Sequence, residues 1–190
     1  MADPNAVICL GEALIDRLGP LGGDPACDQP VDDRLGGAPA NVACGLARLG
    51  TAVSFVGRLG GDVIGADFQR LFDQRGVDTS TLQVDPLQPT RIVLVRRSLD
   101  GERQFQGFAG DQGDGFSDQA LQPVALSTTA RWLLVGTIPL ASPQSAQALL
   151  DAMEQARSHG IALAVDVNWR PTFWDATADP VAGPTQAARS

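Results

Sequence analysis

The sequence contains no lysine, and its basic side chains are 14 arginines spread along a chain of 190 residues. With 22 acidic residues, the formal net charge is -8 at pH 7. A nucleic-acid-binding surface needs clustered basic side chains that neutralise phosphates. The charge pattern therefore argues against a nucleic-acid partner and favours small polar ligands or proteins.

Cysteine is scarce, and long apolar runs are absent. Cys9, Cys27 and Cys44 lie far apart without CxxC spacing, which is typical of reduced thiols in a cytoplasmic protein rather than of a disulfide framework or a zinc site. No basic segment precedes the first apolar run, and no apolar span reaches 18 residues. We therefore expect no signal peptide, no membrane contact and a cytoplasmic location.

The order of apolar segments predicts the fold class. A chain of this length, 44% hydrophobic, can form one domain with a sizeable core. Short apolar runs predict strands at 7–10, 52–56, 131–135 and 162–165, and amphipathic segments predict helices at 39–49, 62–74 and 142–159. This alternation predicts an α/β fold with a mostly parallel sheet and helices on both faces.

Two helices carry more detailed expectations. In the first helix, Val42, Ala43, Leu46 and Leu49 share one face, which we expect to be buried. The third helix is expected to begin at an N-cap formed by Ser142.

Two segments interrupt the strand–helix alternation. The segment 17–35 is rich in Gly, Pro and Asp, and the segment 91–108 is typical of a hairpin that turns at Asp100-Gly101. Strands of a hairpin are not joined by a helical crossover, so we expect a small antiparallel β flap at the edge of the main sheet, over about 12–35 and 89–110. Flaps of this kind often close over ligands.

Polar side chains follow the predicted strands at the edge of the sheet where ligands bind in open α/β folds. Asp16 follows the first strand, and Asp166, Asn168 and Arg170 follow the fourth. Alternation would place the last three on one side if that strand continues.

The stretch GGAPANVA at 36–43 predicts a second polar feature beside them. Gly36 and Gly37 allow a close approach of the backbone, Pro39 suits a helix start, and the helix N-terminus presents unpaired N–H groups. Asn41 lies in the first turn of that helix. The stretch is therefore suited to hold a polar ligand.

These blocks resemble one known family. GGAPANVACGLARLG, followed by Gly60, resembles the first signature of the ribokinase-like carbohydrate kinases, the PfkB family. GEALID, GRLGGDVIGADF and DVNWRPTFW add further blocks in the family's order, so that the resemblance covers nearly the whole chain and is strongest to fructokinases.

The resemblance implies roles for individual residues. Asp16 and Asn41 would bind sugar hydroxyls, and Gly36 and Gly37 would let the backbone close on the sugar. Asp166, Asn168 and Arg170 would lie towards the phosphates. Arg170 and the hairpin residue Arg103 are also expected to contact the substrate. The implied reaction transfers a phosphoryl group from ATP, with Mg²⁺, to a sugar hydroxyl. Families of this type often dimerise through the flap, which Ile92, Leu94 and Phe105 would suit.

The resemblance also implies a part that is missing. The family's catalytic aspartate lies in a GAGD-type motif beside an anion hole, and no such motif occurs in this sequence; GDQGDG at 110–115 lacks an apolar strand before it. Gly183 and Pro184 predict a new helix with only about six residues after them, fewer than the roughly 12 that an isolated helix needs. We therefore expect residues 1–190 to be one incomplete ribokinase-like domain that carries the sugar-binding half and is inactive alone.

Other interpretations remain open at this stage. Asp16 is also typical of a turn, Asn41 of a helix-terminal backbone contact, Arg103 of a cross-strand contact, and Arg170 of a surface pair with Asp175. The lone histidine, His159, is expected at a helix C-terminus. A non-catalytic sugar-binding or regulatory protein, or a kinase acting on ribose, adenosine or 2-keto-3-deoxygluconate, would share these features. A dinucleotide-binding oxidoreductase would need GxGxxG after the first strand, where the chain has GEALID.

Overall fold

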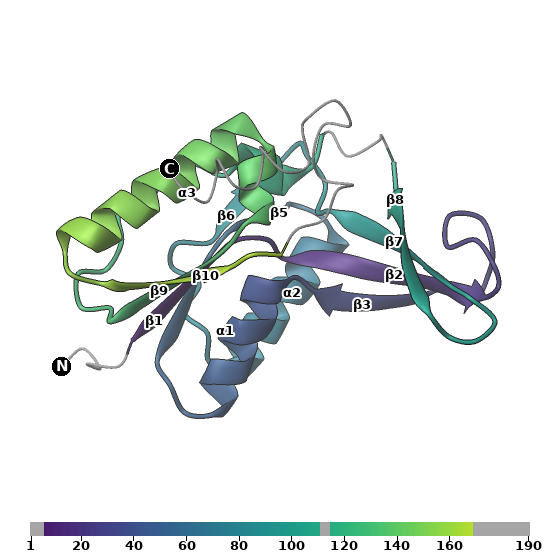
Figure 1. The fold of residues 1–190 in the computed structure, drawn as a ribbon, viewed down its shortest axis with the longest axis horizontal. Helices are drawn as coiled ribbons and strands as arrows, with labels where there is room; N and C mark the ends of the chain where they lie inside the picture. The colour runs from purple at the N-terminus through teal and green to yellow at the C-terminus, as the bar shows by residue number, and fades with distance from the viewer. Residues whose placement is uncertain (1–5, 111–114, 169–190) are drawn as a thin grey trace.

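The fold was analysed in a computed structural model that describes residues 6–110 and 115–168 (Figure 1). The strands are β1 (Val7–Leu10), β2 (Leu14–Leu21), β3 (Asp32–Gly36), β4 (Val53–Val56), β5 (Arg58–Gly60), β6 (Gln83–Asp85), β7 (Ile92–Arg97), β8 (Arg103–Phe108), β9 (Trp132–Gly136) and β10 (Ala162–Asp166). The helices are α1 (Ala38–Arg48), α2 (Val63–Arg75) and α3 (Pro143–Ser158), with the short 3₁₀ turns η1 (Ser117–Ala120) and η2 (Ile138–Ala141).

The main sheet is parallel, as the alternation predicts. Its order is β10-β9-β1-β4, and every neighbouring pair is parallel. All four predicted strands are confirmed, and their ends agree with the structure to within about one residue. Since the strands run the same way, their carboxyl ends meet at one edge of the sheet.

Helices cover both faces of this sheet (Figure 1). Ile8 and Leu10 of β1 pack with Leu149 of α3 on one face, while Cys9 packs with Phe68 of α2 on the other. This alternation is the period-2 pattern of a strand buried on both sides. Burial also raises the pKa of the Cys9 thiol to about 12, which leaves it protonated and unreactive.

The face predicted for α1 is partly wrong. Pro39, Ala40 and Ala43 are its buried residues, whereas Val42 is 36% and Leu49 83% exposed. Small side chains lie towards the sheet because the helix approaches it closely at its N-terminal end, and Leu49 lies beyond the last helical turn. Ser142 does occupy the N-cap of α3, but its side chain makes no cap hydrogen bond, so that part of the expectation is also wrong.

The flap is a four-stranded sheet in the order β3-β2-β7-β8, which we call the lid. The predicted hairpin is confirmed, since β7 pairs antiparallel with β8 around Gly101. The prediction of an antiparallel flap is wrong for the central pair, because β2 and β7 are parallel. Both strands leave the main body in the same direction and each then turns back in its own hairpin. The lid projects from one end of the molecule (Figure 1).

Two polar networks fix the base of the lid to the main body. Arg91 is buried, donates two hydrogen bonds to the Asp118 carboxylate at 2.8 and 2.9 Å, and lies near the rings of Phe108 and Phe116. Asp62 accepts hydrogen bonds from the backbone and side chain of Thr90, at 2.7 and 2.9 Å. These contacts fix the start of β7 relative to α2 and η1.

Candidate functional site

The candidate site lies where β1 leads into β2 and where α1 begins. Asp16 is the third residue of β2 rather than a residue just after the first strand. A Cβ atom placed on Gly36 would lie 2.7 Å from Oδ2 of Asp16, so a side chain there would displace this carboxylate. The structure thus brings Asp16 and Gly36 together.

Gly37 is the N-cap of α1 and requires glycine for two reasons. Its φ is +98°, a backbone conformation that other residues rarely adopt, and a Cβ atom there would lie 2.5 Å from the carbonyl oxygen of Glu12. The connection from β3 into α1 therefore passes directly against the connection from β1 into β2. No side chain therefore covers the backbone of Gly37 at the point where α1 presents its unpaired N–H groups.

Asn41 lies one turn into α1, where its own N–H donates to the Gly37 carbonyl at 2.9 Å. Asn41 is exposed, and its side chain makes no hydrogen bond to the part of the chain that the structure describes. The alternative that Asn41 binds helix-terminal backbone through its side chain is therefore not what the structure contains. The side chain of Asn41 therefore does not cap its own helix.

Glu12 is a member of this site that the sequence analysis did not single out. Its side chain is 1% exposed, and its Oε1 accepts a hydrogen bond from the Ala38 N–H at 3.2 Å. Desolvation, with smaller contributions from the charges of Asp118 and Asp166, raises the pKa of Glu12 to about 7. The signal available in the sequence was an acidic residue directly after an apolar strand, where burial is expected.

The polar residues at the end of β10 lie on the same edge of the sheet. Asp166 is the last residue of β10 and pairs with Gly136 at the end of β9. The strand ends there, so the alternation expected through Asn168 does not apply; the Asn168 N–H instead donates to Thr137 Oγ1 at 3.1 Å. Arg170 and Asp175 lie outside the described residues.

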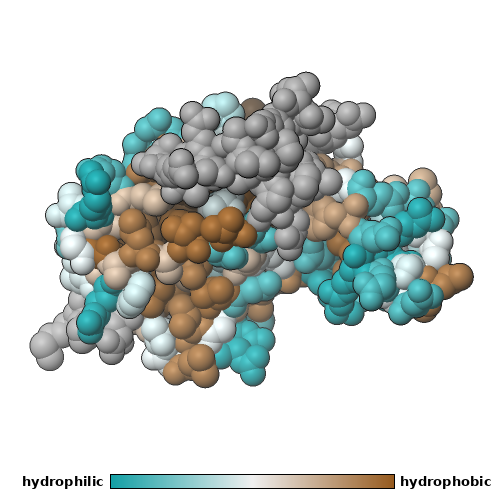
Figure 2. Space-filling model, in the orientation of Figure 1, coloured by the Kyte–Doolittle hydropathy of each residue, from teal (hydrophilic) through white to brown (hydrophobic). Residues whose placement is uncertain are grey.

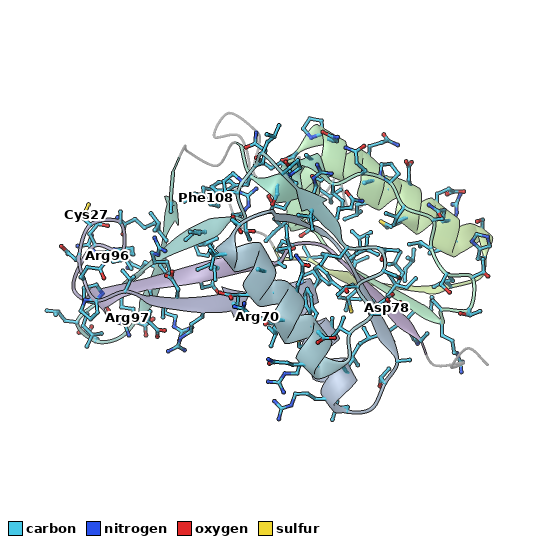
Figure 3. The ribbon with its side chains drawn as sticks, turned by 180° about the vertical axis from the view of Figure 1, so that it is seen from behind. Cys27, Arg70, Asp78, Arg96, Arg97 and Phe108 are labelled. Atoms are coloured by element: carbon cyan, nitrogen blue, oxygen red, sulfur yellow. The ribbon has the colours of Figure 1, made fainter. Side chains whose placement is uncertain are left out.

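Arg103 does not lie near Asp16, Gly36 and Gly37. It lies on β8 opposite Arg97, and Arg97 pairs with Leu21 of β2, five residues beyond Asp16. Along β7, however, Arg97 lies four residues beyond Val93, the partner of Asp16, because β2 has a register shift between Leu18 and Leu21. At about 3.3 Å per residue, this places Arg103 roughly 13 Å further out along the lid. Figure 3 shows Arg97 in the outer part of the lid and Phe108 closer to the main body.

The lid residues expected to support a dimer differ in accessibility. Leu94 is 6% exposed and already buried within the protein, whereas Phe105 is 38% exposed. The expectation for Leu94 as an interface residue is therefore wrong.

The glycines at 60 and 65 allow neighbouring segments to approach closely. A Cβ atom on Gly65 would lie 2.0 Å from the Gly60 carbonyl oxygen, and one on Gly60 would lie 2.5 Å from the Thr90 nitrogen. Gly65 thus allows α2 to pack closely against β5, and Gly60 allows the segment before β7 to approach β5.

Neither a metal cluster nor a membrane span is found in the described parts of the chain. No group of three or more His, Cys, Asp or Glu side chains there is placed to hold a metal ion. No described helix has the length and apolar character needed to cross a membrane.

Comparison with known families decides how these features belong together. The model of the pfkB family carbohydrate kinases matches residues 5–185. The chain belongs to the pfkB family. The match includes both glycines, Asp16 and Asn41, together with the strands and the lid that position them. The ribokinase-like fold predicted from the sequence is confirmed by solved pfkB-type structures.

The curated relatives of this pfkB chain include several fructokinases. It is 33% identical over 170 residues to a fructokinase of Vibrio alginolyticus, covering 90% of this chain and 53% of that protein. It is 34% identical over 169 residues to fructokinase-1 of Oryza sativa, covering 88% of this chain and 52% of that protein. The chain thus spans about half the length of these relatives.

Solved structures agree with the sequence relatives. A fructokinase from Xylella fastidiosa superimposes with a TM-score of 0.83 at 28% identity, covering 96% of this chain and 58% of that one. A structure of the fructokinase from the same organism with bound ATP gives a TM-score of 0.81 at 29% identity and the same coverage.

Proposed function

We propose that this protein is the sugar-binding portion of an ATP-dependent fructokinase. The observation that carries the proposal is the grouping of the Asp16 carboxylate, the bare backbone of Gly36 and Gly37, and the Asn41 amide at the carboxyl edge of the sheet, in a pfkB chain whose relatives include fructokinases. Ligands of open α/β sheets bind at this edge.

In this proposal the side chains position the acceptor hydroxyl. The Asp16 carboxylate accepts hydrogen bonds from sugar hydroxyls, and Asn41 both donates and accepts. Leu14 and Leu18 lie on the same face of β2 as Asp16, by strand alternation, and pack with Val93. These side chains are buried, so they support the strand that carries Asp16 from within the protein.

Phosphoryl transfer also needs a base and stabilisation of the developing charge. The GAGD-type motif expected to supply the base does not occur in these 190 residues. We propose that the 190-residue chain binds sugar without turnover and that ATP is the phosphoryl donor of the complete enzyme. The described residues do not form a metal cluster, so we derive no step through Mg²⁺ from them.

A titration of the purified chain with fructose tests the sugar site. We expect Asp16→Asn to weaken fructose binding about 10- to 100-fold, because hydrogen bonds to a charged acceptor contribute about 1.5–3 kcal/mol. The matched control is Asp73→Asn, the same change at an exposed position on α2, which should leave binding unchanged. Equal binding by Asp16→Asn and the wild type would contradict the proposed site.

A substrate panel and a turnover assay test the rest of the proposal. Fructose should bind more tightly than ribose, adenosine or 2-keto-3-deoxygluconate, and a tighter alternative would reassign the acceptor. Fructose-dependent release of ADP by the 190-residue chain would contradict the proposal that the catalytic base lies outside these residues. A non-catalytic sugar-binding protein, which the missing motif also favours, predicts no turnover even by the full product of the gene.

A further inference from the structure

Glu12 occupies an unusual position at the start of α1. It lies in the connection between β1 and β2, yet its Oε1 accepts the hydrogen bond from Ala38, the first residue of the helix. The N-cap, Gly37, has no side chain with which to accept such a bond. Serine or aspartate cannot replace Gly37, because a Cβ atom would lie 2.5 Å from the Glu12 carbonyl oxygen. The helix is therefore capped from a different segment.

The second carboxyl oxygen of Glu12 is held without a partner. Oε2 is buried and accepts no hydrogen bond from the described residues. The backbone of Gly136 lies close to this oxygen. A Cβ atom placed on Gly136 would lie 3.0 Å from Oε2 of Glu12 and 3.0 Å from Cγ of Pro39. A buried carboxyl group with one unsatisfied oxygen lowers the stability of the fold in either protonation state. We therefore expect Glu12 to have a role that offsets this cost.

We propose that Glu12 is a positioning residue for the acceptor sugar, whose carboxyl fixes the N-terminus of α1 so that Gly37 and Asn41 meet the sugar in one geometry. This proposal rests on the proposed function. Gly37 and Asn41 lie within one helical turn of Ala38, since the Asn41 N–H donates to the Gly37 carbonyl. Displacement of the Ala38 bond would therefore move both groups.

The charges around Glu12 give the proposal a pH signature. Asp118 from η1 and Asp166 from β10 oppose its ionisation, although Asp118 is bound to Arg91, and the Ala38 N–H at the positive end of α1 favours it. With its pKa raised to about 7, Glu12 changes charge near neutral pH. The carboxylate is the stronger acceptor, so the bond from Ala38 should tighten as the pH rises through about 7.

Stability should change in the opposite direction. The folded-state pKa of Glu12 lies above its ordinary value of 4.5, so its contribution to stability is fully present below about 4.5 and is lost as the pH rises through about 7. Glu12→Gln cannot titrate and should lack this part of the pH dependence. The comparison of wild type and variant isolates Glu12 from the other carboxyl groups.

The first experiment follows the Ala38 amide by ¹⁵N–¹H NMR as the pH is raised from 5 to 8.5. In the wild type its shift should titrate with a midpoint near 7, and in Glu12→Gln it should stay constant. This measurement does not depend on sugar binding. A wild-type Ala38 shift that stays flat while the Glu12 carboxyl carbon titrates would overturn the coupling of Glu12 to the helix.

The second experiment measures fructose affinity in the same proteins. Glu12→Gln retains an acceptor for Ala38 and should bind within about threefold of the wild type but with its pH dependence altered, whereas Glu12→Leu should bind at least about tenfold more weakly. Gly136→Ala presses a methyl group against Oε2 without changing any charge and should also weaken binding. Gly45→Ala, the same change where no atom lies within 4 Å, should have no effect.

The outcomes separate the two proposals. If the wild type binds fructose and both Glu12→Leu and Gly136→Ala bind it equally well, Glu12 is not a positioning residue, while the proposed function stands. If the wild type binds no sugar, both proposals are overturned, and the Ala38 titration still shows whether Glu12 caps the helix. Should Glu12→Leu fail to fold, Gly136→Ala and Glu12→Gln carry the test.

Discussion

At the scale of single residues, glycine acts here through two different physical effects. Gly37 has φ +98° and ψ 125°, and it also faces the Glu12 carbonyl oxygen. Gly76, at the C-cap of α2, has φ +74° with no atom near a Cβ position. The first site combines backbone strain with a steric limit, and the second involves backbone conformation alone. Only the first belongs to the candidate site.

Alanine substitution should separate these effects. Gly76→Ala should cost about 1 kcal/mol, the usual penalty of a left-handed conformation. Gly37→Ala should cost about 2–4 kcal/mol, because the strained backbone and the methyl contact add. Urea unfolding of the two variants gives the comparison. Equal losses of stability would mean that the backbone around Glu12 relaxes freely and that the close approach has no energetic weight.

At the scale of secondary-structure elements, one carboxylate joins α2 to the lid. Asp62 is the N-cap of α2 and accepts from the Gly65 N–H at 2.8 Å. The same carboxylate accepts from the Thr90 N–H and hydroxyl just before β7. Thr90 is 1% exposed, so its N–H is shielded from water in the folded protein and has Asp62 as its acceptor. The cap is therefore also the attachment of a lid strand.

Loss of this carboxylate should destabilise the protein more than loss of an ordinary cap. Asp62→Ala should cost about 2–4 kcal/mol, from the lost cap and the unsatisfied Thr90 N–H. Ser142→Ala is the matched control, since Ser142 is an N-cap without a side-chain bond, and it should change stability by less than about 0.5 kcal/mol. Thermal or urea unfolding distinguishes them; similar small losses would show that Thr90 finds another acceptor.

At the scale of the whole molecule, one face of the main sheet carries an apolar groove. The groove has a volume of about 560 Å³ and is lined by Val7, Val42, Leu46, Thr51, Arg131, Trp132, Leu134 and Ala164. Trp132, at the start of β9, is 49% exposed. Figure 2 shows apolar side chains gathered between α1 and α3, where the edge strand β10 lies. Contiguous apolar surface of this kind is a site of association.

The groove should bind a hydrophobic dye in the folded 190-residue chain, as expected for uncovered apolar surface. Trp132→Gln should lower dye binding several-fold by removing the largest apolar group of the lining. Leu87→Gln, at a position 88% exposed and outside the groove, serves as the control. Dye fluorescence at a protein concentration where the chain is monomeric is the measurement. Equal binding by both variants would place the dye elsewhere.

Sequence patterns predicted the elements of this fold well, and two of its contacts poorly. Apolar runs bounded by glycines located all four strands of the main sheet and all three helices, because period and caps are local properties. The parallel pairing of β2 with β7 escaped prediction, since it joins segments about 77 residues apart. The face of α1 was partly wrong because the approach of the helix to the sheet, rather than its hydrophobic period, decides which side chains are buried.

The sequence by itself determined the family, the order of the four main-sheet strands and the described helices, and the close approach of Gly36 and Gly37 to other groups, all of which depend on residue type and spacing. The parallel pair β5 and β6 was not predicted. Only the tertiary structure decided that Asp16 lies against Gly36, that Arg103 lies far from both, and that Glu12 caps α1 from another segment. These are contacts between distant segments. Desolvation determines whether a side chain is charged, and its distance from other groups determines which of them it can contact. Both depend on how the whole molecule packs.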